Sequence, residues 1–146
     1  THTHMAREAQ TAPDEDLRIR GVVLPDGQER ELWVHDGVLV EGPLSGARTL
    51  ADGCWIIPGL VDAHNHIGLD AHGAVGTETA DEQARTEAKT GTLLIRDAGS
   101  PSDTHWIDDR DDLPRVIRAG RHIARPKRYI RNYAAELDPD NLVAEV

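Results

Sequence analysis

Two histidines separated by one residue stand where an apolar run of the sequence ends. The stretch WIIPGLVDAHNH, residues 55–66, is largely apolar as far as Val61 and then presents His64 and His66. Side chains alternate between the two faces of an extended strand, so these two histidines are predicted to point the same way. Two neutral imidazoles on one face can bind a single transition-metal ion, zinc above all. The spacing alone is more typical of two loop histidines without a ligand role, but the position directly after an apolar strand favours a metal site.

The segments around the histidines indicate a parallel β/α architecture. Residues 56–61 form a short continuous apolar run, which predicts a strand buried on both faces. Residues 79–89 are rich in helix formers, with Thr79 as the N-cap, Glu82 completing a capping box, and Gly91 ending the helix. The histidines then lie just beyond the C-terminal end of a parallel strand, where α/β folds place their chemistry.

The same alternation continues along the chain. Residues 92–95 are predicted to form a second buried strand and residues 115–119 a third. A last helix is expected to begin at Asp138, with Pro139 at its first position. The fold class is therefore α/β. Because three strands and one weakly apolar helix cannot cover both faces of a parallel sheet, we expect further polypeptide to complete it.

The first third of the chain has a different pattern of apolar and turn residues. Residues 17–54 contain short apolar strands separated by turn signals, among them Pro25-Asp26-Gly27 and Asp36-Gly37. They predict a small antiparallel β unit. Residues 1–16 are polar and have no periodicity, so they are predicted to be a disordered tail or the remnant of an expression tag.

Composition narrows the class of protein. The 146 residues carry a formal net charge of −10, which argues against a nucleic-acid partner. The single cysteine, Cys54, excludes an internal disulfide and favours a reducing compartment. No apolar stretch approaches the roughly 20 residues that a membrane span needs, and no signal segment is evident. A soluble cytoplasmic protein without a membrane partner is the expectation.

Three segments carry a resemblance to a known family. GCWIIPGLVDAHNH, residues 53–66, is similar to the first barrel strand of the amidohydrolase superfamily; GTLLIRDAG, residues 91–99, resembles its second strand, and LPRVIRAGRHI, residues 113–123, its third. The resemblance covers residues 17–146 and is closest to the branch of imidazolonepropionases and prolidase-like enzymes. It implies part of a small β-sandwich at 17–54, followed by the N-terminal part of a (β/α)8 TIM-like barrel at 55–146.

By this resemblance the protein is expected to be a metal-dependent hydrolase of a carbon–nitrogen bond, in an amide, a cyclic amide or a dipeptide. His64 and His66 would be the first two ligands of a site for one or two divalent ions, usually zinc. Such a metal lowers the pKa of bound water to about 7 and polarises the scissile carbonyl. The bridging lysine, the other ligands and the general base are expected downstream, because Lys89 and Lys127 both precede the fourth barrel strand.

A full barrel needs about 250 residues, so the chain is expected to be an N-terminal fragment, inactive alone. Its expected partners are a small-molecule substrate and the remainder of the same polypeptide, with a homo-oligomer as a further option. Two alternatives stay open. One is a metal-free barrel relative that acts as a binding or assembly protein. The other is a self-contained metal-binding domain, which would leave strand edges exposed.

Four further residues are candidates for a supporting role at the site. Asp62 could orient a ligand histidine or be merely structural. His72 could touch substrate or be an exposed loop residue. Arg96 and Asp97 end the second strand at the same edge as the histidines, where they could bind substrate or brace the loop.

Charge is unevenly distributed in the second half of the chain. Residues 103–112 hold five aspartates and one arginine, whereas residues 113–135 hold six arginines and Lys127 without an acid. We expect the acidic run to be a solvated loop anchored by Trp106 and Ile107. The basic segment is expected either to serve an anionic substrate or to pair with the acidic loop.

Overall fold

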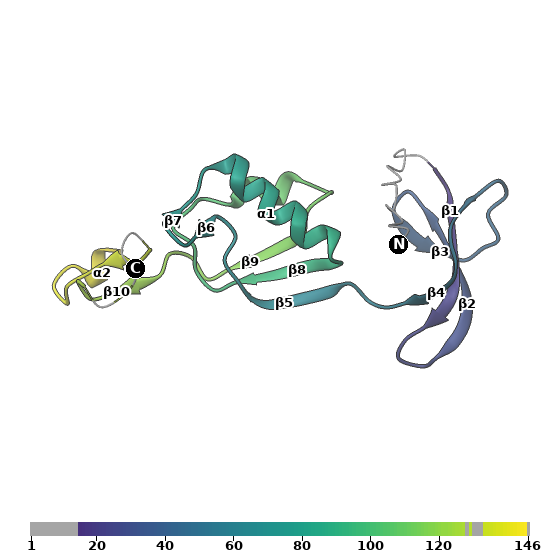
Figure 1. The fold of residues 1–146 in the computed structure, drawn as a ribbon, viewed down its shortest axis with the longest axis horizontal. Helices are drawn as coiled ribbons and strands as arrows, with labels where there is room; N and C mark the ends of the chain where they lie inside the picture. Colours follow the sequence, from purple (N-terminus) through teal and green to yellow (C-terminus); the bar gives the residue numbers. More distant parts are fainter. Residues whose placement is uncertain (1–14, 128, 130–132, 146) are drawn as a thin grey trace, which may run out of the picture. The chain divides into compact units, whose positions relative to one another are not determined.

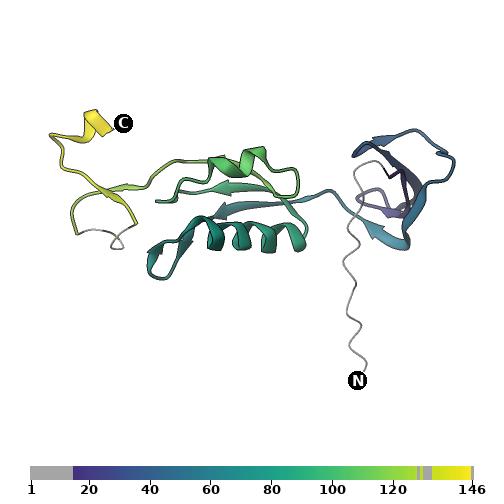
Figure 2. The same ribbon diagram turned by 90° about the horizontal axis from the view of Figure 1, so that it is seen from above.

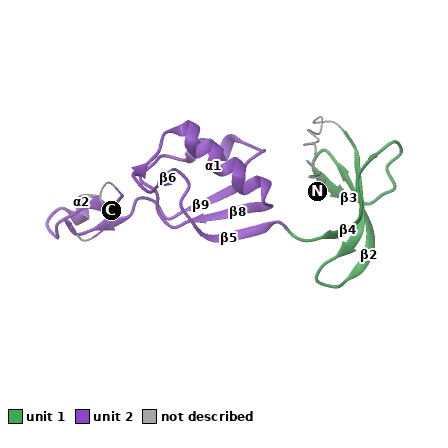
Figure 3. Ribbon diagram, viewed as in Figure 1, with its two compact units in different colours: residues 1–58 green, residues 59–146 purple. Residues whose placement is uncertain are grey.

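The computed structural model describes residues 15–127, 129 and 133–145 (Figure 1). It divides into two compact units, Thr1–Pro58 and Gly59–Val146 (Figure 3). The tail predicted at residues 1–16 lies outside the described residues except for Glu15 and Asp16, which pair with Arg48 at 2.8 Å and His35 at 2.6 Å. Among the described residues, no helix has the length and apolar character to cross a membrane.

The first unit is one sheet of four strands in the order β3-β2-β1-β4. Strands β1 (Leu17–Val23), β2 (Gln28–His35) and β3 (Val38–Val40) pair antiparallel, as predicted. The turn between β2 and β3 has positive φ at both Asp36 and Gly37, which is the conformation of a tight hairpin turn.

Strand β4 (Arg48–Ile56) was not predicted, and it pairs parallel with β1. Its Asp52-Gly53 sequence is typical of a turn, so the sequence pattern does not predict a strand here. In the structure Gly53 has a φ of 69° and stands where the β1–β4 register shifts, so this glycine forms an irregularity inside a strand.

The second unit is built on a parallel sheet of three strands in the order β5-β8-β9. A 13-residue helix, α1, connects β5 to β8 and lies along one face of the sheet (Figure 1). This strand–helix–strand order was predicted. The elements are β5 (Leu60–Asn65), β6 (Leu69–Asp70), β7 (Gly73–Ala74), α1 (Thr77–Lys89), β8 (Thr92–Asp97), the 3-10 helix η1 (His105–Asp109), β9 (Arg115–Arg118), β10 (Ile123–Ala124), β11 (Ala135–Glu136) and α2 (Leu142–Glu145).

The apolar run at residues 56–61 is not one strand, which corrects the prediction. Strand β4 ends at Ile56 and β5 begins at Leu60. Pro58, between them, has no N–H to donate to a sheet. Gly59 passes so close to Leu93 that a Cβ at residue 59 would lie 2.3 Å from that side chain. The run therefore connects two sheets instead of forming one buried strand.

Both predicted helix starts are also wrong. Helix α1 begins at Thr77 with Gly76 as N-cap, and the Ala80 N–H donates to the Gly76 carbonyl at 3.0 Å as the first helical hydrogen bond. Because glycine has no side chain, no side-chain hydrogen bond caps this end. Thr79 thus lies within the first turn. At the other end Gly91 follows the helix with a φ of 91°, as predicted. Helix α2 begins at Leu142, since residues 138–141 form a turn first.

Small residues let α1 approach the sheet closely. Ala80 and Ala84 are buried, and they pack with Ile95 of β8, which is fully buried. Ile107 of η1 joins the same cluster, so the acidic segment is anchored as predicted. Figure 2 shows α1 and the three strands of this unit from above. One face of the sheet is therefore covered.

The other face is open in the described chain. Arg96 pairs with Ile117 in the β8–β9 register, and Val61 pairs with Leu94 between β5 and β8, which places these side chains together on that face. Val61 is 62% exposed and Ile117 59% exposed. Burial on both faces was predicted, and among the described residues only one face has it.

We predict that Ile95→Ala lowers the free energy of unfolding of the 146-residue chain by about 2–5 kcal/mol, because it leaves a cavity under α1. The matched variant Ile117→Ala, on the neighbouring strand but the open face, should change it by less than about 0.5 kcal/mol. Urea denaturation followed by circular dichroism measures both. Equal losses would contradict the one-sided core.

Candidate metal site

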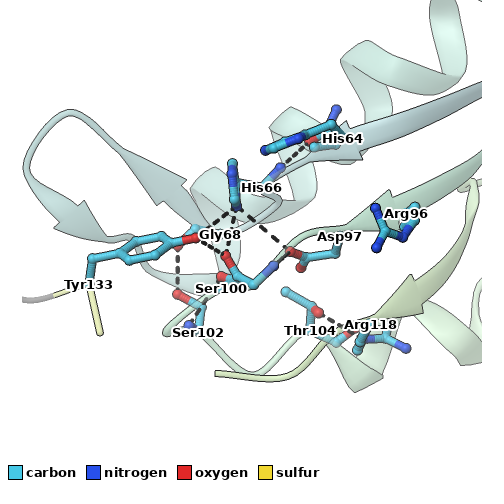
Figure 4. Close-up of polar contacts among 12 residues, drawn as sticks. His64, His66, Gly68, Arg96, Asp97, Ser100, Ser102, Thr104, Arg118 and Tyr133 are labelled. Atoms are coloured by element: carbon cyan, nitrogen blue, oxygen red, sulfur yellow. Dashed lines mark hydrogen bonds and ion pairs between the residues drawn. The ribbon is translucent and has the colours of Figure 1, made fainter. Parts of the chain in front are cut away.

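The two histidines flank the end of β5, and the structure brings their rings together. The ring centroids of His64 and His66 are 5.2 Å apart, with an angle of 74° between the ring planes (Figure 4). His64 is exposed, whereas His66 is half-buried. Their proximity agrees with the strand alternation from which the pair was predicted.

Asp62 shapes the backbone between these histidines. Its Oδ1 accepts the His64 backbone N–H at 3.0 Å, and its Oδ2 accepts the side-chain amide of Asn65 at 2.7 Å. The hydrogen bond from the His64 backbone lowers the pKa of the Asp62 carboxyl. Asn65 also donates to Glu87 of α1 at 3.1 Å, so it points away toward the helix. Asp62 therefore fixes the backbone of His64, and no hydrogen bond or ion pair between its carboxylate and a histidine ring is observed among the described residues.

Three groups surround the Nδ1 atom of His66 (Figure 4). The Gly99 carbonyl lies 2.7 Å away, the Tyr133 hydroxyl 3.1 Å away and Asp97 Oδ1 4.0 Å away. A histidine that donates its Nδ1–H to a carbonyl keeps its Nε2 lone pair for a metal. A neutral His66 that donates to Gly99 through Nδ1 would therefore leave its Nε2 free for a metal.

Asp97 fixes the loop that presents the Gly99 carbonyl. Its buried carboxylate accepts the Gly99 N–H at 2.8 Å. Gly99 has a φ of 124°, which a residue with a side chain rarely adopts. Burial raises the pKa of the Asp97 carboxyl, although the Gly99 N–H opposes this shift. Of the two roles expected for Asp97, substrate binding or bracing of the loop, the structure shows that Asp97 braces the loop.

Tyr133 belongs to this cluster, and the sequence analysis missed it. Its side chain is buried, and its hydroxyl lies 2.6 Å from the Gly99 carbonyl. Burial raises the pKa of this hydroxyl. Tyr133 follows His66 by 67 residues and matches no motif, so only the three-dimensional structure relates the two.

The remaining candidates lie outside this cluster. Arg96 is exposed, and its guanidinium donates to the Ala63 carbonyl at 3.4 Å, which braces β8 against β5. His72 is exposed between β6 and β7, and its backbone N–H donates to Asp70. In the described part of the chain, no hydrogen bond or ion pair connects His72 to the histidine pair.

His64 and His66 fit two positions of a metal site. Their rings are adjacent, and the Nδ1 of His66 is engaged by a carbonyl. Within residues 15–127, 129 and 133–145, no group of three or more His, Cys, Asp or Glu side chains is arranged to hold a metal. A catalytic zinc normally has three protein ligands. The described residues therefore supply only two of the protein ligands that such a site would need.

The fold resembles solved structures of amidohydrolases. A crystal structure of an amidohydrolase superposes with a TM-score of 0.65 at 19% identity, covering 89% of this chain and 42% of that one. A Bifidobacterium longum protein assigned as a prolidase gives 0.65 at 18% identity, covering 88% and 35%. A Xaa-Pro dipeptidase with methionine in its active site gives 0.55 at 19% identity, covering 75% and 34%. The chain has the fold of the N-terminal region of these proteins.

Sequence relatives are found in mycobacteria. Uncharacterized proteins of Mycobacterium bovis and Mycobacterium tuberculosis are 54% identical to the chain over 125 residues, which is 86% of this chain and 34% of each relative. The chain thus spans about a third of the length of these relatives. No family model matches it.

We predict unequal costs for two substitutions of Asp97 in the metal-free protein. Asp97→Ala leaves the Gly99 N–H without its acceptor, which should cost about 1–3 kcal/mol of unfolding free energy. Asp97→Asn keeps an acceptor and removes the buried charge, so it should cost less.

The pH dependence follows from the raised pKa of Asp97. Because the folded state binds the proton more tightly than the unfolded state, the wild-type contribution of Asp97 becomes less favourable as pH rises from about 4 through its folded pKa. The stability of Asp97→Asn relative to wild type should therefore increase over that range. Denaturation at several pH values checks this, and a relative stability that falls with pH would refute the assignment.

Proposed function

We propose that this chain is the N-terminal part of a metal-dependent amidohydrolase that hydrolyses a carbon–nitrogen bond. The observation that carries the proposal is the pairing of the His64 and His66 rings with the Nδ1 of His66 held by the Gly99 carbonyl. The resemblance to amidohydrolase structures supports it through the fold alone. Together they favour a hydrolase over a binding protein that merely retains the fold.

Each residue of the cluster has a defined task under this proposal. His64 and His66 hold a divalent ion, with zinc favoured by imidazole ligands. When bound, such an ion supplies the Lewis acidity that activates water and polarises a carbonyl. Asp62 fixes the backbone of His64, and Asp97 fixes the loop whose carbonyl orients His66. The further ligands and the general base come from polypeptide beyond the described residues.

The substrate class that we favour is a small molecule with an amide-type bond, such as a dipeptide. Two of the similar structures carry the names prolidase and Xaa-Pro dipeptidase, and the third carries the broader name amidohydrolase. Substrate choice in barrels of this kind depends on loops after several strands. An amide or a cyclic amide is therefore an equal member of the proposed class.

The proposal also requires further polypeptide against the open sheet face. Val61 and Ile117 are large apolar side chains that a parallel sheet normally buries. The mycobacterial relatives have about two thirds of their length outside the matched segment. We propose that the remainder of the same polypeptide covers this face and brings the missing ligands; a second copy of the chain is the competing occupant.

We predict that the intact polypeptide binds a divalent metal through His64 and His66. Either His64→Ala or His66→Ala should reduce metal occupancy after dialysis to a minority of sites and abolish hydrolysis of dipeptides. His105→Ala, an exposed histidine paired with Asp103, is the matched control and should retain both. Metal content by mass spectrometry and amino-acid release measure the two properties. Full occupancy with unchanged activity in both site variants would refute the ligand assignment.

We further predict that Ile117→Ala behaves differently in the intact polypeptide and in the 146-residue chain. If later strands cover the open face, the cost should rise to about 2–5 kcal/mol, the value of a buried isoleucine. Chemical denaturation of the intact protein measures it. A cost as small as that of the short chain would show that this face stays uncovered, and a cost that depends on protein concentration would favour a second copy.

A further inference from the structure

We propose that Tyr133 is a positioning residue that holds the Gly99 carbonyl in place as the hydrogen-bond acceptor of the His66 ring. This inference rests on the proposed function, since it concerns how one ligand is prepared for a metal. Three atoms form a closed triangle: Tyr133 oxygen to Gly99 oxygen at 2.6 Å, His66 Nδ1 to Gly99 oxygen at 2.7 Å, and Tyr133 oxygen to His66 Nδ1 at 3.1 Å.

For a neutral His66 ring, counting protons in this triangle leaves one arrangement without a clash of lone pairs. The Gly99 carbonyl can only accept, and it has two lone pairs. If His66 Nδ1 were bare, its lone pair would face the carbonyl oxygen at 2.7 Å without a proton between them. The proton must therefore be on Nδ1, donated to Gly99 and shared with the Tyr133 oxygen, while the tyrosine donates its own proton to Gly99. The Nε2 of neutral His66 is then bare.

The position of Tyr133 is set by its packing. The side chain is buried, and its ring meets the ring of His66 edge-on at 5.7 Å. On the other side its centroid is 5.3 Å from the rings of both His122 and Tyr129. Ala135, two residues on, donates its N–H to the His122 carbonyl at 2.7 Å. The packing of its ring on both sides thus fixes the position of the Tyr133 hydroxyl beside the Gly99 carbonyl.

Removing the hydroxyl should weaken both parts of this arrangement. In Tyr133→Phe the Gly99 carbonyl loses one of its two donors, and the His66 Nδ1–H loses one of its two acceptors. The Gly99 carbonyl still requires a proton on Nδ1, but it is less firmly held, so the His66 ring is less well oriented for a metal. Residues that orient a ligand histidine typically change metal affinity by about 10–100-fold when substituted.

The test compares Tyr133→Phe with Tyr129→Phe in the intact polypeptide. Tyr129 is the matched control because its ring packs against His122 and Tyr133, in the same cluster. The first readout is the NMR spectrum of the His66 imidazole in metal-free protein, which identifies the Nδ1–H tautomer and gives the rate at which that proton exchanges with water. The second is zinc affinity by competition with a chromophoric chelator, and thermal unfolding reports whether each variant is folded.

We expect all three proteins to give the Nδ1–H pattern. In Tyr133→Phe that proton should exchange with water faster than in wild type and Tyr129→Phe, and zinc affinity should be lower by about 10–100-fold. Wild-type protein with Nε2–H, or Tyr133→Phe with an unchanged exchange rate, would overturn the inference. The NMR readout needs no metal. If wild type binds no zinc while the Nδ1–H exchange responds as expected, the proposed function fails and the positioning role of Tyr133 stands.

Discussion

The hydrogen bond between His66 Nδ1 and the Gly99 carbonyl joins the ends of two neighbouring parallel strands. Parallel pairing brings the carboxyl ends of β5 and β8 to one edge of the sheet, and this 2.7 Å contact turns that proximity into a fixed side-chain orientation. It depends in turn on Asp97, which holds the Gly99 N–H, and on Ile95, whose burial under α1 fixes β8. The packing of the two buried alanines of α1 against Ile95 thus contributes to the orientation of the His66 ring.

Asp97 illustrates how this arrangement is maintained against a cost. A buried carboxylate is unfavourable, and its raised pKa reflects the loss of hydration. The cost is partly offset because the carboxylate accepts the Gly99 N–H, which would otherwise be buried without a partner. The buried charge of Asp97 lowers the stability of the fold at neutral pH. The same carboxylate holds the loop so that the Gly99 carbonyl points toward His66. Such local conflicts are expected where function requires a particular geometry.

Sequence reasoning reached the histidine pair because strand alternation is a local rule, and it reached α1 and β8 through periodicity and Gly91. It failed where a local signal has two meanings. Asp52-Gly53 is a turn signal, but here the glycine lies inside β4, whose pairing with β1 is a long-range contact. It also failed at Tyr133, because a contact spanning 67 residues leaves no pattern in sequence. Local rules located the histidine pair, and only the tertiary structure could identify the residues that contact it.

Under the proposed function, the histidine pair and the open sheet face both require further polypeptide. Two imidazoles leave a divalent ion short of protein ligands, and exposed Val61 and Ile117 leave a parallel sheet with one solvated apolar face. In a parallel sheet, each strand added beyond β9 would supply a new carboxyl end at the edge where His66 lies and would curve the sheet toward closure. Under the proposed function, one continuation of the sheet thus satisfies both demands. With only the described residues available, a metal held by this histidine pair would have to take its remaining ligands from solvent.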